Sequence, residues 1–128
     1  MLGHTFRYHV QNGTGVNVTF TVKDRRFKFA SDGSLTFAAE ATPINAAVVG
    51  TGAFGNSANI DNSTQKDLGA NITVTFAPSA SATGTVSLFL QRSTDNGTTW
   101  PTNGTGVFLA AVTYAATSTS QVRNAQVR

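Results

Sequence analysis

This sequence predicts an all-β fold, an antiparallel β-sandwich with a jelly-roll-like arrangement of about seven or eight short strands. Apolar residues alternate with polar ones at a period of two along most of the chain. Turn residues separate the alternating runs at intervals of roughly 8–15 residues. Strong helix formers are scarce, whereas Thr favours strands and Asn, Gly and Ser favour the turns between them.

The N-terminal third predicts two hairpins. Residues 6–10 and 16–22 are alternating runs, and the Asn12-Gly13 step between them is a strong hairpin signal. A third run begins at Phe27, and the apolar pattern resumes at Leu35 beyond the turn of residues 31–34. We therefore expect one hairpin on each side of residues 23–26.

The rest of the chain alternates between regular and irregular segments. Residues 38–55 fit either a short helix beginning at Thr42-Pro43 or a connection that contains some strand, and we favour the connection. Residues 56–69 predict a loop flanking a short strand, and residues 72–76, 86–90 and 107–114 predict three further strands. We expect one β-sandwich domain over residues 1–117 and a polar C-terminal arm or tail over residues 118–128.

Charged residues make up only 12% of the chain, about half the usual share. A polar but weakly charged surface suits a protein that packs against other proteins more than a freely diffusing enzyme. No apolar run approaches the roughly 20 residues of a spanning helix. The N-terminal residues carry no pattern of a signal peptide, so we expect synthesis in the cytoplasm without export.

The basic residues are concentrated near the N-terminus, where residues 23–28 read Lys-Asp-Arg-Arg-Phe-Lys. This segment fits either the solvated end of a strand or a docking site for an acidic protein surface. Nucleic acid is a weaker candidate, because grooves for it interleave more basic and aromatic residues. The candidate partner-docking residues are Lys23, Arg25, Arg26, Lys28, Arg123 and Arg128.

Residues suited to catalysis are few. His4 and His9 are five positions apart on a strand-like segment, so they should face opposite sides, which is a poor arrangement for one metal ion. The carboxylates of Asp61, Asp67 and Asp95 each lie beside turn residues, where Asp commonly binds its own backbone. We therefore expect a protein that is not an enzyme and that has no catalytic residues, no cofactor and no metal site.

Residues 93–100, Ser-Thr-Asp-Asn-Gly-Thr-Thr-Trp, resemble the Asp-box of sialidase-type propeller blades at every fixed position. The resemblance implies a structural hairpin built on Ser93, Asp95, Gly97 and Trp100. Asp95 would accept hydrogen bonds from turn amides, and Gly97 would supply a positive φ. Trp100 would anchor the turn on the following strand. Propellers carry several copies of the box, and one copy argues against a sialidase.

Two longer stretches, residues 58–76 and 85–101, occur in an order that resembles small β-sandwich virion proteins of tailed bacteriophages. That group includes capsid cement (decoration) proteins and tail or neck components. The resemblance implies a structural protein of the virion, made in the bacterial host cytoplasm. It would bind other virion proteins, major capsid or tail proteins. Because the edge strands of a small, weakly charged sandwich need to be paired or covered, we also expect a homo-oligomer, such as a trimer. With no apolar run of spanning length, we expect no membrane contact.

Three other functions compete with a cement protein. A tail or neck component has the same implied fold. A carbohydrate-binding module of a tail fibre would need an exposed aromatic platform, for which the candidates are Tyr8, Phe89, Trp100 and Tyr114. A hydrolase would need two acids in one cleft.

Overall fold

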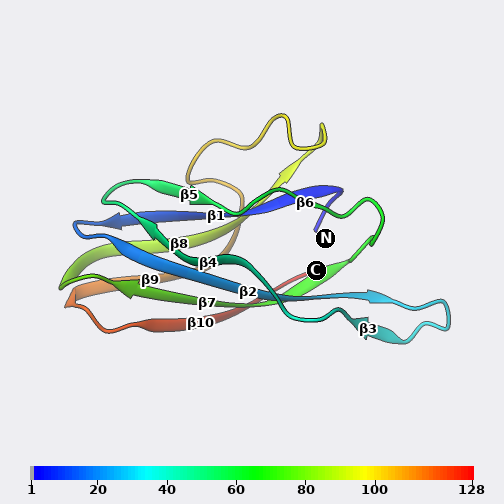
Figure 1. Cartoon of the computed structure of the whole chain (residues 1–128), viewed down its shortest axis with the longest axis horizontal. Coiled ribbons are helices and arrows are strands. Elements are labelled where there is room, and N and C mark those ends of the chain that lie inside the picture. The colour runs from blue at the N-terminus through cyan, green and yellow to red at the C-terminus, as the bar shows by residue number, and fades with distance from the viewer. Residues whose placement is uncertain (1) are drawn as a thin grey trace.

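The computed structural model describes residues 2–128, which form ten strands and no helix. The strands build two antiparallel five-stranded sheets that pack as a sandwich (Figure 1). Sheet A has the order β5-β1-β8-β9, with β6 also paired to β1. Its strands are β1 (Thr5–Thr14), β5 (Phe54–Asn56), β6 (Ile60–Asp61), β8 (Ala82–Ser93) and β9 (Val107–Thr117). The predicted fold class, an all-β sandwich, is confirmed.

Sheet B has the order β10-β7-β2-β3, with β4 also paired to β2. Its strands are β2 (Val18–Phe29), β3 (Leu35–Phe37), β4 (Ala41–Val49), β7 (Gly69–Pro78) and β10 (Gln121–Val127). The alternation of the sequence places one apolar face of each sheet in the interior. Rings of Phe20 and Phe76 meet edge to face at 5.4 Å in that core. Its other large members include Phe6, Tyr8, Ile72, Leu88 and Leu90.

The predicted hairpin at Asn12-Gly13 is wrong, because β1 and β2 belong to different sheets. The connection turns a corner of the sandwich instead. Asn12 is fully buried there, and its Nδ2 donates to the carbonyls of Val16, Val49 and Gly50 at 2.8–3.2 Å. Its Oδ1 accepts the backbone N–H of Thr14 at 3.0 Å. The Asn-Gly step therefore marks a turn, but the buried amide directs the chain into the opposite sheet.

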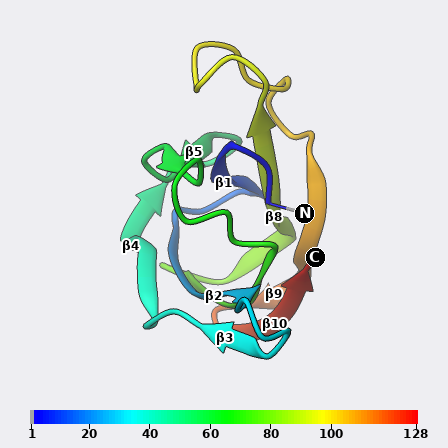
Figure 2. The same cartoon turned by 90° about the vertical axis from the view of Figure 1, so that its right-hand side faces the viewer.

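The second predicted hairpin is confirmed, with Phe27 opposite Phe37 and Phe29 opposite Leu35. The predicted break before Phe27 is absent, because β2 runs without interruption from Val18 to Phe29. The β2–β3 hairpin projects beyond the body of the sandwich in Figure 1. In Figure 2 it lies on the opposite side of the molecule from the loop of residues 94–106.

The middle and the C-terminal segment also form strands. Residues 41–49 are β4, so the helix alternative at Thr42-Pro43 is wrong. Residues 121–127, expected to be part of an arm, are β10, which pairs with β7 from Gln121↔Phe76 to Val127↔Ala70. Ala125 and Val127 turn inward at a spacing of two and cover one side of the core. Two small apolar residues in a polar segment are too weak a pattern to reveal this strand.

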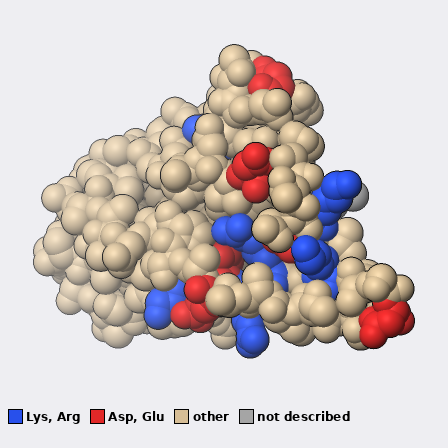
Figure 3. Space-filling model, turned by 45° about the vertical axis from the view of Figure 1, so that its right-hand side comes forward, with Lys and Arg blue, Asp and Glu red and all other residues tan. Residues whose placement is uncertain are grey.

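The two ends of the sandwich differ in charge. One end is formed by the turns after β1, β4, β7 and β9, and we call it the charge-free end. Residues 8–22, 41–60, 68–91 and 96–122 contain no Lys, Arg, Asp or Glu. Both termini and the β2–β3 hairpin lie at the other end (Figure 1). On the face shown in Figure 3, the blue and red side chains gather towards this second end.

Candidate functional site

The basic cluster of residues 23–28 lies on β2, where alternate side chains face opposite sides of sheet B. Lys23 and Arg25 are exposed on the outer face, and Lys23 lies 3.8 Å from Glu40. Arg26 points the other way, between the sheets, with its guanidinium 5.5 Å from the Phe6 ring centre. Arg25 and Arg26 therefore face opposite sides of sheet B, because adjacent strand residues alternate, and the structure does not bring the two side chains together on one surface.

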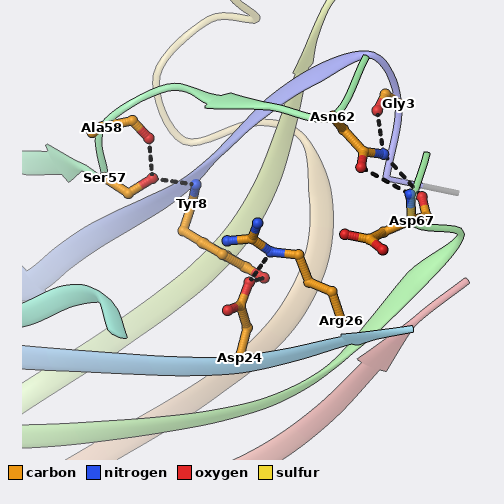
Figure 4. A network of polar contacts seen from close by, with 8 residues as sticks. All are labelled: Gly3, Tyr8, Asp24, Arg26, Ser57, Ala58, Asn62 and Asp67. Carbon is orange, nitrogen blue, oxygen red and sulfur yellow. Dashed lines mark hydrogen bonds and ion pairs between the residues drawn. The ribbon is translucent and has the colours of Figure 1, made fainter. Parts of the chain in front are cut away.

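Arg26 belongs to a buried ionic network between the sheets (Figure 4). Its Nε donates to Oδ2 of Asp24 at 3.0 Å, and the Tyr8 hydroxyl donates to the same oxygen at 2.8 Å. Asp24 is 1% exposed, and no group of the described chain donates to its Oδ1. Burial, with the neighbouring Asp24 carboxylate, raises the pKa of Tyr8 far above its ordinary value. Tyr8 therefore stays a donor, and the network joins β1 to β2.

A second polar cluster in Figure 4 fixes the connection between β6 and β7. Asn62 donates from Nδ2 to the carbonyls of Gly3 and Asp67 at 3.0 and 2.9 Å. Its Oδ1 accepts the backbone N–H of Asp67 at 2.9 Å. Ser57 accepts the backbone N–H of Tyr8 at 2.9 Å. These side chains therefore hold loops in place.

The remaining predicted docking residues do not form one cluster. Lys28 lies on the inward-facing side of the hairpin and donates to the carbonyl of Gln65 at 3.0 Å. Arg123 is exposed at the edge strand β10, where its Nη1 donates to the carbonyl of Val122 at 2.9 Å. Arg128 follows β10 and lies beside the apolar side chains of the β2–β3 hairpin. Only Lys23, Arg25 and Arg128 therefore share the outer face of sheet B.

The Asp-box residues form a turn after β8. Ser93 Oγ donates to Asp95 Oδ1 at 2.7 Å, and Asp95 Oδ1 accepts the Thr99 N–H at 2.8 Å. These hydrogen bonds from Thr99 and Ser93 lower the pKa of Asp95 to about 2. Gly97 has a φ of 87°. Trp100 stays half-buried: its Nε1 donates to the Gly97 carbonyl at 3.0 Å, and the Arg7 guanidinium of β1 lies 4.3 Å from its ring centre.

Two buried polar side chains tie the loop of residues 94–106 to sheet A. Gln91 is fully buried and donates to the Thr105 carbonyl at 2.8 Å. His9 is also fully buried, and its Nε2 accepts the Gly104 N–H at 2.9 Å. Nδ1 of His9 lies 2.7 Å from Asn56 Oδ1. His9 therefore fastens a loop. Alternation alone could not predict this burial, because both residues stand at outward positions of their strands. The loop covers them, and the Phe54 ring also stacks on His9 at 5.4 Å.

The aromatic platform expected of a carbohydrate-binding module is not assembled from its candidates. Tyr8 and Tyr114 are buried in the core at 0% and 2% exposure. Phe89 is half-buried on the outer face of sheet A, in edge-to-face contact with Phe108. Trp100 covers Arg7. Two of the four candidates are thus unavailable to a ligand.

No protein-family model matches the chain, and no curated protein or solved structure is significantly similar to it. Among residues 2–128, no three His, Asp or Glu side chains are grouped so that they could hold a metal ion. The same residues contain no helix long and apolar enough to cross a membrane.

Proposed function

We propose that this chain is a non-enzymatic structural protein of a bacteriophage particle, a capsid cement or decoration protein that binds and stabilises the shell. The charge-free end carries the proposal. Four turns there, over residues 13–17, 50–53, 78–82 and 116–120, contain no charged side chain. Exposed charge keeps freely diffusing proteins apart, whereas the centres of protein interfaces are depleted of it.

Exposed valines strengthen this interpretation. Val48 of β4 and Val122 of β10 are 65% and 54% exposed, and both stand near the charge-free end. The turns themselves are cross-linked by the hydrogen bonds Asn12 N–H to Ala53 carbonyl and Ser79 N–H to Asn17 carbonyl. A rigid, uncharged and partly apolar surface loses little entropy when a neighbouring subunit covers it.

Three of the six carboxylates lack the electrostatics of a general acid. Asp32 and Asp61 accept hydrogen bonds from Ser34 and Ser63, and these bonds lower the pKa of each carboxyl. Asp95 is held ionised in the same way. A general acid for glycoside hydrolysis needs the opposite shift, a raised pKa.

The test is fractionation of particles from an infected culture of the bacterium that makes this chain, with heads and tails probed by a specific antibody. We expect the chain in the head fraction, whereas recovery with tails would favour the tail or neck alternative. Recovery only as free protein would contradict a virion role. A paired variant, Thr51→Glu with Ser118→Glu, should lose particle binding. The matched variant, Thr64→Glu with Thr102→Glu, adds the same charge elsewhere and should still bind.

A further inference from the structure

Two adjoining grooves run across the outer face of sheet B. The first, which we call the polar groove, has a volume of about 520 Å³, and its lining includes the polar residues Lys23, Arg25, Glu40, Asn71, Asn124 and Gln126. The second has a volume of about 320 Å³ and is mainly apolar, lined by Phe27, Phe29, Leu35, Phe37 and Leu68 with Gln126 and Arg128. Gln126 lines both grooves, and the Arg25 guanidinium lies 5.3 Å from the Phe37 ring centre. The two grooves therefore form one continuous docking face.

We propose that this docking face binds an extended segment of a partner protein. One large apolar side chain of the segment enters the groove at the hairpin, and acidic side chains follow along the polar groove towards Arg25 and Lys23. The assignment rests on the assembly role proposed above and identifies the chemistry of the partner.

The apolar groove has the features of an anchoring pocket. Phe29, Leu35 and Phe37 are 61%, 46% and 44% exposed although they stand side by side on paired strands. Phe27 forms the floor of the groove above Gly69, where an added Cβ would collide with its ring. Apolar anchors in such pockets supply much of the free energy of binding at protein interfaces.

The charges beside this groove select an acidic partner. Lys23, Arg25 and Arg128 line the two grooves, and Glu40 is the only acid with an exposed side chain among the lining residues. Arg25 is positioned by a hydrogen bond from Nε to the Ala38 carbonyl at 3.2 Å and by the Phe37 ring. A carboxylate that reaches this fixed guanidinium forms a charge-assisted hydrogen bond.

Other occupants fit less well. A second copy docked by a two-fold axis would oppose the same patch, and so bring like charges of both copies together. A bilayer would meet the hairpin tip first, where Asp32 is exposed beside Ser31, Gly33 and Ser34. An acidic polypeptide avoids both costs.

The experiment measures binding of the full chain to a fluorescein-labelled decapeptide in which Leu-Phe is followed by four acidic residues. A matched peptide carries Lys in place of each acid, and separate arms use phosphatidylglycerol vesicles and a thymidine oligonucleotide. We expect the acidic peptide to bind best, with a salt-dependent affinity. Amide chemical-shift changes should concentrate on β2, β3, β7 and β10.

Matched variants separate the docking face from general surface effects. Phe29→Ser and Arg25→Gln should each weaken binding of the acidic peptide by about tenfold. Phe108→Ser removes an equally exposed ring, 61% in both cases, from sheet A and should leave the affinity unchanged. Lys66→Gln is the corresponding control for charge.

The proposal is overturned if the Lys peptide, the vesicles or the oligonucleotide bind as well as the acidic peptide, or if Phe29→Ser binds like the wild type. A binding peptide with no recruitment of the chain to particles would refute the virion role and leave the docking face standing. If the chain is still recruited to particles after Phe29→Ser and after Arg25→Gln, the docking face is refuted and the virion role stands.

Discussion

The two ends of the sandwich achieve order by different means. At the charge-free end, the buried amide of Asn12 donates to three carbonyls and accepts two donors from Thr14, so each of its polar atoms is satisfied. Towards the opposite end, the buried carboxylate of Asp24 pairs with Arg26 and Tyr8 through one oxygen, while the other has no donor within the described chain.

At each end, the charge of the buried network matches the charge of the surface above it: both are neutral at the charge-free end, and both are charged towards the opposite end. With a neutral network inside and an uncharged surface outside, a neighbour could cover that end without removing a charged side chain from water. A buried ion pair, in contrast, destabilises the fold strongly when one of its two partners is removed, because the other charge is left buried without a counter-charge. We therefore expect the charged end to be the more sensitive of the two to substitution, and the following variants compare the two ends directly.

Asp24→Ala should give the largest loss. It leaves the guanidinium of Arg26 without its carboxylate and the Tyr8 hydroxyl without its acceptor. The free energy of unfolding, measured by urea denaturation, should fall by about 3–5 kcal/mol. Glu40→Ala removes an exposed acid that lies 3.8 Å from Lys23 and should change it by less than about 1 kcal/mol. Equal effects of the two variants would contradict a buried network.

Asn12→Ala should be the next most damaging. The carbonyls of Val16 and Val49 lose a buried donor, at a cost of about 1–3 kcal/mol. The exposed Asn45, changed to Ala, is the control and should be neutral. Hydrogen exchange should speed up at the charge-free turns in the first variant, and an effect spread evenly over both sheets would argue against a local network.

Trp100→Ala should cost about 1–2 kcal/mol, because it removes the hydrogen bond from Nε1 to the Gly97 carbonyl and the contact of a half-exposed ring with the Arg7 guanidinium. The hydrogen bonds that Ser93 makes to Asp95 and Gly97 should persist, since they do not involve the indole. Thermal denaturation measures the loss. A loss as large as that for a core aromatic residue would restore the anchoring role predicted from the Asp-box.

The smallest effect should be a dependence on pH through His9. Burial lowers the pKa of His9 below its ordinary value of 6.5, and the nearby Arg7 charge acts in the same direction. Below that value the unfolded chain takes up a proton that the folded chain resists, so stability should decrease as the pH falls through this window. Protonation at Nε2 also removes the acceptor of the Gly104 N–H.

The measurement compares urea midpoints at pH 7.5 and 5.5 for the wild type, His9→Gln and His4→Gln. The exposed His4 serves as the control. His9→Gln should lose part of the dependence, and His4→Gln should keep it. An unchanged dependence in His9→Gln would exclude His9 as its source.

The sequence was sufficient for the sandwich and for most strands, because alternation reports directly which side chains face the core. It could not tell which sheet a strand joins, and so the corner at Asn12 looked like a hairpin. The sequence predicted the β2–β3 hairpin, but it did not predict that the apolar face of this hairpin is exposed. The reason is that Phe27, Phe29, Leu35 and Phe37 have the spacing of core residues. The buried contacts of Asp24 with Arg26 and Tyr8 could likewise not be predicted, because they depend on how β2 packs against β1 of the other sheet.

Hydrogen–deuterium exchange of the free chain and of the particle-bound chain tests the central claim most directly, because it reports both ends at once. The account predicts protection on binding in two regions, the hairpin of residues 25–38 with β10 and the charge-free turns of residues 13–17 and 50–53. The loop of residues 94–106 should exchange at the same rate in both states. Protection confined to that loop and sheet A, or no protection anywhere, would contradict the account.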